Sequence, residues 1–251
     1  LLVDDRGAVW VGHFQAGLDY SLYQNGLFRT YAYPPQFNSA NLSIRSFVNR
    51  GPEKVIGSRD GLFYINEATG IVKSFVKPVL TSDLILTICF YEGEYYIGTY
   101  GGGMMVLNPQ TLSLKYFTQG DTELFQKGHI FCVKPDNRGN LWIGTSQGLF
   151  CYNGQTKQIK NFTSTNSQLP EGNVYEVSFD STGKGWIATE TGMCIYDPAS
   201  QSLRSNVFPE GFVHKDKVRT IYEDAEHNLY FIREKGSLFT STLTMDHFRN
   251  Q

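Results

Sequence analysis

Residues 136–149 read Asp-Asn-Arg-Gly-Asn-Leu-Trp-Ile-Gly-Thr-Ser-Gln-Gly-Leu, and this pattern decides the fold. Two other stretches repeat it, at residues 4–18 and 180–193. In all three, an Asp precedes a Gly by three residues and a Trp by six, and a second Gly follows the Trp by six or seven. Because every Trp of the chain lies in this pattern, the sequence is built from an internal repeat.

Weaker copies of the pattern fill the gaps between these stretches. We call the six equivalent positions the slot residues, and they are Trp10, Val55, Tyr96, Trp142, Trp186 and Tyr230. Their spacing predicts six repeats in a single β-propeller domain or fragment, at about 1–43, 44–84, 85–128, 129–173, 174–217 and 218–251.

Each copy has the sequence of four short strands. In Asp-x-x-Gly, the Asp can bond the following backbone amides and the Gly can adopt a positive φ, which is typical of a tight turn. Period-two alternation between turns predicts an all-β fold. Four strands in a repeat of this length predict a β-propeller with four-stranded antiparallel blades, and a solenoid of stacked sheets is the lesser alternative.

The closure of such a propeller is left open by the sequence. No spare strand is visible to complete the last blade, so either six blades meet directly or a seventh lies outside the chain, and we favour the second. The chain starts at Leu1 and not at Met, so we expect a piece of a longer protein. Five of the six fourth strands carry a basic residue, which we interpret as protection of an outer edge strand rather than as a binding patch: Arg29, Lys73, Lys115, Lys160 and Arg204.

Composition and motifs exclude several functional classes. The 251 residues carry a net charge of −2, which argues against nucleic-acid binding. No apolar run approaches the ~20 residues that span a bilayer. The five His and four Cys residues form no metal-ligand spacing, so we predict no metal and no cofactor.

For the four cysteines, we expect buried free thiols, with one disulfide or a reactive Cys as the alternative. Gly101-Gly102-Gly103 is interpreted as a turn, with close approach of a ligand as the alternative.

The unit D-x-x-G-x-[LV]-W-[IV]-G-T-x-x-G-L resembles the two-component regulator propeller repeat, most closely at residues 136–149. This resemblance implies the periplasmic sensor region of a hybrid two-component protein, which responds to oligosaccharides from glycan degradation and signals to a histidine kinase. It also implies a homodimer formed through the parent sensor, and contact with the membrane only through flanking segments absent from this chain.

In a propeller, the turns between second and third strands share one face with the entrances to the first strands, and ligands usually bind on that face. Function is therefore expected where the copies differ there. The candidate ligand-binding residues are Arg45, Arg59, Tyr100, His129, Tyr175, Glu190, Arg219 and Arg233. Aromatic rings can stack on sugars, and the charged groups can bond hydroxyls or acidic groups.

These residues form no catalytic motif, so we predict no catalytic residue and a non-catalytic sensor. Two alternatives stay open. One is a propeller lyase resembling streptogramin B lyase, which shares D-x-x-G-x-[IVL]-W but continues with Phe-Thr. The other is a protein-interaction propeller, which would expose a contiguous apolar patch. A sialidase is disfavoured because its Asp box has one residue, and not two, between Asp and Gly.

Overall fold

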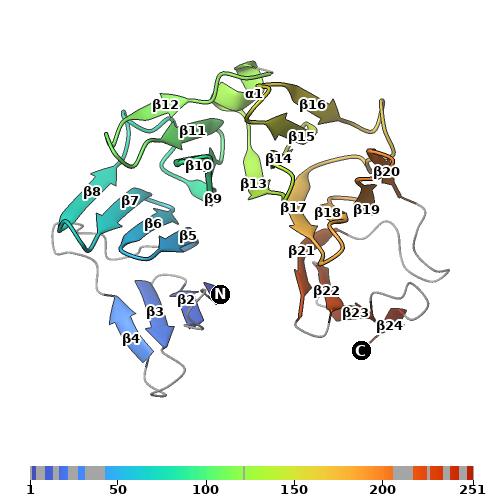
Figure 1. The fold of residues 1–251 in the computed structure, drawn as a ribbon, viewed down its shortest axis with the longest axis horizontal. Coiled ribbons are helices and arrows are strands. Elements are labelled where there is room, and N and C mark those ends of the chain that lie inside the picture. The colour runs from blue at the N-terminus through green and yellow to red at the C-terminus, as the bar shows by residue number, and fades with distance from the viewer. Residues whose placement is uncertain are drawn as a thin grey trace. The chain divides into compact units, whose positions relative to one another are not determined.

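A computed structural model of the chain describes ten segments of it. They are residues 2–3, 9–13, 17–21, 28–31, 43–120, 122–205, 217–224, 227–233, 238–242 and 248–250. Side chains are described for residues 43–120, 123–205, 217–224 and 227–232. These segments form six four-stranded antiparallel sheets, which confirms the predicted all-β propeller fold (Figure 1).

The first three sheets follow one another along the chain, and in each the four strands pair in sequence order. Their strands are β1 (Leu2–Val3), β2 (Val9–His13), β3 (Gly17–Ser21), β4 (Phe28–Tyr31), β5 (Ile44–Arg50), β6 (Glu53–Ser58), β7 (Gly61–Asn66), β8 (Ile71–Phe75), β9 (Ile85–Tyr91), β10 (Glu94–Thr99), β11 (Met104–Leu107) and β12 (Leu114–Tyr116). One short helix, α1 (Thr122–Lys127), follows β12.

The other three sheets have the same order. Their strands are β13 (Ile130–Pro135), β14 (Asn140–Thr145), β15 (Gly148–Asn153), β16 (Ile159–Phe162), β17 (Val174–Phe179), β18 (Gly185–Thr189), β19 (Gly192–Asp197), β20 (Ser202–Arg204), β21 (Val218–Glu223), β22 (Asn228–Arg233), β23 (Leu238–Thr242) and β24 (Phe248–Asn250). Each of the six sheets falls within one predicted repeat.

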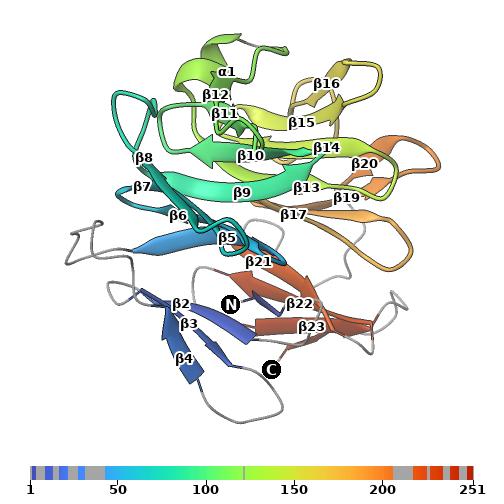
Figure 2. The ribbon, with the colours of Figure 1, turned by 60° about the vertical axis from the view of Figure 1, so that its left-hand side comes forward.

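The chain divides into two compact units, which we describe separately. Unit 1 comprises residues 1–117 and 125–127, and unit 2 comprises residues 118–124 and 128–251. Within unit 1, strand β5 packs against β9, and within unit 2, β13 packs against β17 and β17 against β21 (Figures 1 and 2). The first strands of neighbouring sheets therefore lie side by side.

A hydrogen bond explains why the Asp and the Trp of the motif are six residues apart. In the fourth sheet, Asp136 Oδ1 accepts from the backbone N–H groups of Arg138 and Asn140, each at 2.8 Å, which closes the turn. The other oxygen, Oδ2, accepts from Trp142 Nε1 at 2.9 Å. Trp142 is only 1% exposed, so the carboxylate satisfies an indole N–H that would otherwise be buried without a partner.

The same anchor recurs in the next two sheets. Asp180 Oδ2 accepts from Trp186 Nε1 at 2.8 Å, and Asp224 Oδ2 accepts from the Tyr230 hydroxyl at 2.8 Å. Trp142 packs across the sheet boundary onto Tyr196, with ring centroids 4.5 Å apart. The slot residues of these sheets are therefore scaffold, as the repeat predicts.

Two glycines of the motif are required by packing. A Cβ on Gly144 would lie 2.7 Å from the carbonyl oxygen of Val174 in the next sheet, so only Gly allows β17 to approach β14. Gly148 has a φ of +116°, and a Cβ there would lie 2.5 Å from the Phe162 carbonyl oxygen. These two glycines therefore allow β17 to lie close to β14 and β16 to lie close to β15.

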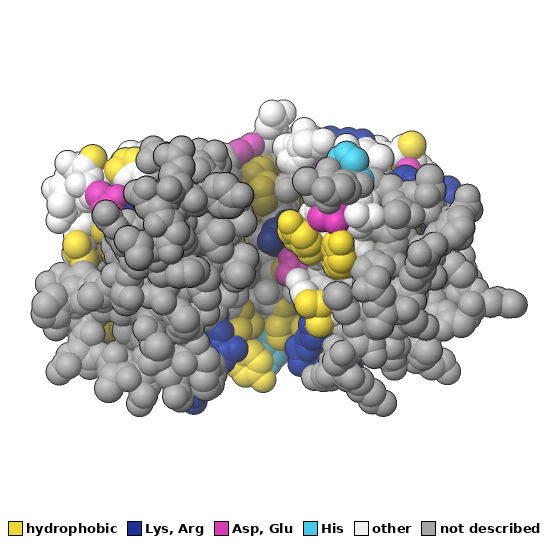
Figure 3. Space-filling view, turned by 90° about the horizontal axis from the view of Figure 1, so that it is seen from below, with side chains coloured by type: hydrophobic (Ala, Val, Ile, Leu, Met, Phe, Trp, Pro, Cys, Tyr) yellow, Lys and Arg dark blue, Asp and Glu magenta, His cyan; other side chains and the backbone are white. Residues whose placement is uncertain are grey.

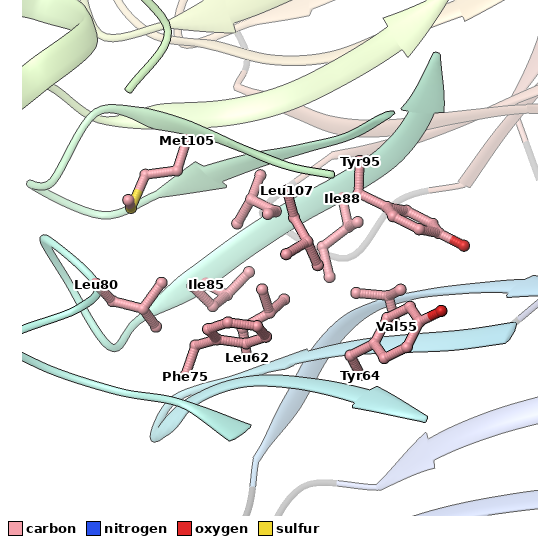
Figure 4. Close-up of a cluster of buried hydrophobic side chains, with 11 residues drawn as sticks. Val55, Leu62, Tyr64, Phe75, Leu80, Ile85, Ile88, Tyr95, Met105 and Leu107 are labelled. Atoms are coloured by element: carbon pink, nitrogen blue, oxygen red, sulfur yellow. The ribbon is translucent and has the colours of Figure 1, made fainter. Parts of the chain in front are cut away.

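The second and third sheets bury a shared apolar core in unit 1, shown in Figure 4. Val55, Leu62 and Tyr64 from the second sheet face Ile85 and other side chains of the third. This cluster of described residues contains no Trp, and the four residues named are at most 1% exposed.

The glycine run and the cysteines are structural where they are described. Gly103 has a φ of +71°, and a Cβ there would overlap the backbone of Phe125 in α1, so the run is a packed turn. All four cysteines are free: Cys89, Cys132, Cys151 and Cys194. Burial raises the pKa of the Cys151 thiol to about 12. Among the described residues, no helix has the length and apolar character that crossing a membrane requires.

Candidate ligand-binding site

A backbone hydrogen bond joins the entrance of the first strand to the end of the second strand in four sheets. The amide of Glu190, after β18, donates to the carbonyl of Asn173, before β17, at 2.9 Å. Equivalent bonds join Arg59 to Ser43, Tyr100 to Leu84, and Ser146 to His129. In these four sheets, the turns between second and third strands therefore lie at the same end as the entrances to the first strands.

Every fully described first strand has a β-bulge close to this end. One residue in each is left out of the pairing register with the second strand: Arg45, Leu86, Phe131, Tyr175 and Arg219. A bulge re-aims a side chain and is common beside functional sites. Because the backbone makes this position equivalent in the five sheets whose first strands are fully described, while its residue changes, it is the place where these copies differ.

In unit 2, the bulge residues of three neighbouring sheets are in contact with one another. The Phe131 and Tyr175 rings meet edge to face, with centroids 5.1 Å apart. The Arg219 guanidinium carbon lies 4.4 Å from the centroid of the Tyr175 ring, a cation–π geometry. Tyr175 is only 9% exposed, whereas Arg219 is exposed. The guanidinium of Arg219 therefore lies over a buried ring and faces solvent.

Glu190 fixes the Tyr175 ring from the turn after β18. Its Oε2 accepts a short hydrogen bond from the Tyr175 hydroxyl and another from Asn173 Nδ2 at 2.9 Å. Its Oε1 lies 3.2 Å from Lys217 Nζ. The hydrogen bond from Tyr175, together with Lys217, lowers the pKa of Glu190, so this carboxylate is ionised at neutral pH.

Lys217 completes this group of side chains, which we call the Tyr175 cluster: Phe131, Asn173, Tyr175, Glu190, Lys217 and Arg219. The ammonium of Lys217 lies 5.0 Å from the centroid of the Tyr175 ring. Its hydrogen bond with Tyr175, and then its contact with Glu190, raise the pKa of Lys217. With two cations and one carboxylate, the cluster has a net positive charge.

The structure unites three of the eight predicted residues, Tyr175, Glu190 and Arg219. It places His129 beside Phe131, with ring centroids 6.2 Å apart, two positions before the bulge. Sequence reasoning missed Phe131, Asn173 and Lys217. Counting back eleven residues from the slot residues Trp142, Trp186 and Tyr230 gives Phe131, Tyr175 and Arg219, so the signal was present in the sequence.

The remaining predicted residues lie elsewhere. Arg45, Arg59 and Tyr100 belong to unit 1, where all three are exposed at the corresponding ends of their sheets. Arg233 ends β22, and its side chain lies outside the described residues.

Another carboxyl group, that of Glu176, lies on β17 next to Tyr175. At this register position, four of the other sheets have small uncharged residues: Ser46, Thr87, Cys132 and Thr220. Burial raises the pKa of Glu176, and Lys134 Nζ, 3.5 Å from its Oε1, acts in the opposite direction. Glu176 is therefore held in an ion pair with the first strand of the preceding sheet.

The described surface has a mixed character. On the face shown in Figure 3, exposed hydrophobic side chains are interspersed with acidic and basic ones. The large exposed hydrophobic residues are scattered over both units: Ile71, Val76, Val79, Tyr100, Tyr116, Tyr222 and Ile232. Among the described residues, no group of three or more His, Cys, Asp or Glu side chains could hold a metal ion.

Comparisons with known proteins identify the repeat. Residues 125–147 match the profile of the family described as two component regulator propeller. No curated protein matches the chain. The extracellular domain of the hybrid two component system BT3049 from B. thetaiotaomicron is similar in structure, with 25% identity, a TM-score of 0.72 and coverage of 94% of this chain and 32% of that chain.

Two further structures show the same fold. The extracellular domain of the hybrid two component system BT4673 from B. thetaiotaomicron has 18% identity and a TM-score of 0.68, over 96% of this chain and 37% of that chain. A structure described as YCF48 bound to D1 peptide has 13% identity and a TM-score of 0.69, over 98% of this chain and 78% of that chain. This chain spans about a third of the two extracellular domains. It is a β-propeller chain in which residues 125–147 match the two component regulator propeller repeat, as its sequence predicts.

Proposed function

We propose that this chain is the ligand-recognition propeller of a hybrid two-component sensor, and that it binds an oligosaccharide from glycan breakdown without altering it. The observation that carries the proposal is the Tyr175 cluster, in which three neighbouring sheets place their specialised bulge residues in contact. The likeness to the extracellular domain of a hybrid two component system supports the sensor role.

The chemistry of the cluster favours binding over catalysis. Both oxygens of Glu190 are occupied by Tyr175, Asn173 and Lys217, and its lowered pKa leaves it no proton to donate at neutral pH. Glu190 therefore orients Tyr175 and Lys217. The groups offered to a ligand are the Arg219 guanidinium and the half-exposed Phe131 ring, which suit the hydroxyls and the apolar face of a sugar.

In this proposal the propeller lies in the periplasm, and ligand binding changes the packing of a sensor homodimer, which passes the signal to a histidine kinase. The differential affinity of the sugar for the two packing states limits the size of that signal.

Calorimetric titration of the full protein with neutral and acidic oligosaccharides tests the proposal. Arg219→Ala should weaken binding about tenfold or more, because it removes the exposed cation of the cluster. The matched control is Lys115→Ala, since Lys115 is exposed on the outer strand β12. Equal binding by the two variants would contradict the site.

Mass spectrometry of the same mixtures tests the absence of turnover. A new product would overturn the non-catalytic role and favour a propeller lyase. If the Glu176→Gln variant no longer formed that product, Glu176, whose pKa is raised by burial, would be the acid–base group of the lyase.

A further inference from the structure

A second recessed surface lies on the outer strands of unit 2. One cavity of about 500 Å³ is formed by β16, β20 and the connecting segment 163–168. A second, of about 480 Å³, is formed by β15, β16 and the turn after β19. Both are lined by Lys160, Phe162 and Gln201, so they adjoin, and we call the combined surface the outer groove. Each volume is within the ~300–1,000 Å³ typical of ligand sites.

The charge of the outer groove is one-sided. Arg138, Lys160 and Arg204 line it, and none of the described lining residues is Asp or Glu. Two carboxylates lie next to the groove. Asp197 Oδ2 is 3.5 Å from Arg204 Nη2, and Asp136 is bonded to its turn and to the slot residue. Even when both carboxylates are counted, the three cations give the groove and its edge a net positive charge, although the whole chain has a net charge of −2.

The lining also includes three side-chain amides that form no hydrogen bond with another described residue. Asn161, Gln158 and Gln201 line the groove, and their side chains make no hydrogen bond to another described residue. Each carries an acceptor oxygen and a two-donor nitrogen, a combination suited to sugar hydroxyls. The outer groove therefore offers cations for acidic groups and amides for neutral ones.

The wall of the groove is fixed in place. Gln168 Oε1 accepts from the backbone N–H of Ser205 at 3.3 Å, which ties the connecting segment to the end of β20. Asn166 Oδ1 accepts from the backbone N–H of Thr163 at 2.8 Å, and its Nδ2 donates to the Asn161 carbonyl at 3.3 Å. The second bond caps the open edge of β16, which obstructs the addition of an extended peptide as a further strand.

The corresponding residues in unit 1 are committed differently. Lys73 on β8 occupies the register position of Lys160, and its Nζ donates to the Leu112 carbonyl of the next sheet at 3.4 Å. Lys115 on β12 occupies the position of Arg204, and its Nζ lies 2.9 Å from Glu94 Oε1, a shorter ion pair than the 3.5 Å between Arg204 and Asp197. Protection of an edge strand explains one cation on each outer strand. It does not explain a groove whose described lining has no Asp or Glu and has three amides without a hydrogen-bond partner among the described residues.

We propose that the outer groove is a second binding site, for an acidic oligosaccharide that bears carboxylate or sulfate groups. The acidic groups pair with Lys160, Arg204 and Arg138, and the hydroxyls bond the amides of Gln158, Asn161 and Gln201. This site uses outer strands, whereas the Tyr175 cluster lies on first strands, and it does not depend on the proposed function.

Titration calorimetry with the full protein tests this site. The probes are tetragalacturonic acid, a heparin-derived tetrasaccharide and neutral cellotetraose. We expect at least one acidic probe to bind at least tenfold more tightly than cellotetraose, with an affinity that falls as salt is raised. The double variant Lys160→Gln/Arg204→Gln should weaken that binding at least tenfold, and Lys73→Gln, at the same register position in unit 1, should change it less than twofold. Thermal melts verify that both variants are folded.

Two further arms separate this site from alternatives. Arg219→Ala should weaken only the binding step of the Tyr175 cluster and keep the salt-dependent acidic-probe step that the double variant lacks. A loss of all acidic-probe binding in Arg219→Ala, with no loss in the double variant, would assign all binding to the Tyr175 cluster and overturn the proposal. A poly-Glu peptide that binds more tightly than either acidic glycan would also overturn it, in favour of a peptide site. Failure of Arg219→Ala to affect any glycan would count against the proposed function alone.

Discussion

The second and third sheets, β5–β12, and the fourth and fifth sheets, β13–β20, solve the same packing problem with different residues. In the fourth and fifth sheets, each slot Trp donates to an Asp of its own sheet, at 2.9 and 2.8 Å. In the second and third sheets, Glu53 accepts from the hydroxyls of Tyr64 and Tyr95, both at 2.8 Å. One carboxylate thus joins two adjacent sheets, because Tyr95 belongs to the third.

This difference shows that the buried anchor of a sheet need not involve the slot residue, since Tyr64 and Tyr95 are not slot residues and the slot of the second sheet is Val55. The requirement is a carboxylate at the turn end of the sheet that satisfies a buried ring donor. Where an indole fills the slot, the partner must accept, because an indole N–H can only donate. A Tyr hydroxyl both donates and accepts, so the Glu53 arrangement tolerates more chemical change.

The largest expected effect is the loss of a slot Trp. Trp142→Ala should lower the free energy of unfolding by about 3–5 kcal/mol, because it removes a buried ring that packs on three others. Val55→Ala, at the same slot in the second sheet, should cost about 2 kcal/mol. Urea melts of both variants measure the difference, and a cost under about 1 kcal/mol for Trp142→Ala would place that slot outside the core.

The next largest effect distinguishes the hydrogen bond to the slot Trp from the hydrogen bonds that close the turn. Asp180→Asn keeps an acceptor oxygen for the Thr182 and Lys184 amides but presents an NH₂ group to the Trp186 N–H. We expect a loss of about 2 kcal/mol, since a buried donor then lacks an acceptor. Asp180→Ala should cost at least as much in the same urea melts, and a smaller loss for Ala than for Asn would show that the turn bonds contribute little.

Glu53→Gln should be milder than Asp180→Asn. The Gln amide can donate to one Tyr hydroxyl while its oxygen accepts from the other, so we expect a loss of about 1 kcal/mol. Comparison with Tyr95→Phe in a double-mutant cycle isolates the shared bond. A loss equal to that of Asp180→Asn would refute the distinction between the two anchors.

The smallest effect concerns alkaline pH. Burial, and then Glu53, raise the pKa of Tyr95. Both states are protonated below the usual Tyr value of about 10, but above it the unfolded chain loses its proton first, so stability falls as pH rises. Tyr95→Phe should make this fall shallower between pH 9 and 11 in urea melts. Tyr100→Phe is the control, because Tyr100 is 50% exposed, and identical slopes for the two variants would contradict the prediction.

Much of the scaffold follows from the sequence. The Asp-x-x-Gly spacing predicts the turn and its bond to Trp142, because those bonds lie within six residues, and the recurrence of the slot predicts that Trp142 is buried. The edge cations are also visible in sequence, although the sixth, Arg249 on β24, emerges only from its pairing with Thr240. The candidate site was predicted in part, since Tyr175 and Arg219 were selected from the repeat, whereas Phe131, at the same offset from its slot residue, was not.

The sequence by itself determined the strand order, the turns and the identity of the slot residues, because a short-period pattern encodes hydrogen bonds between neighbouring strands. Tertiary structure alone decided that Phe131, Tyr175 and Arg219 meet, and that Glu53 serves two sheets. Each of those contacts joins residues about one repeat apart, and their side chains meet only after adjacent sheets pack with a bulge in the first strand.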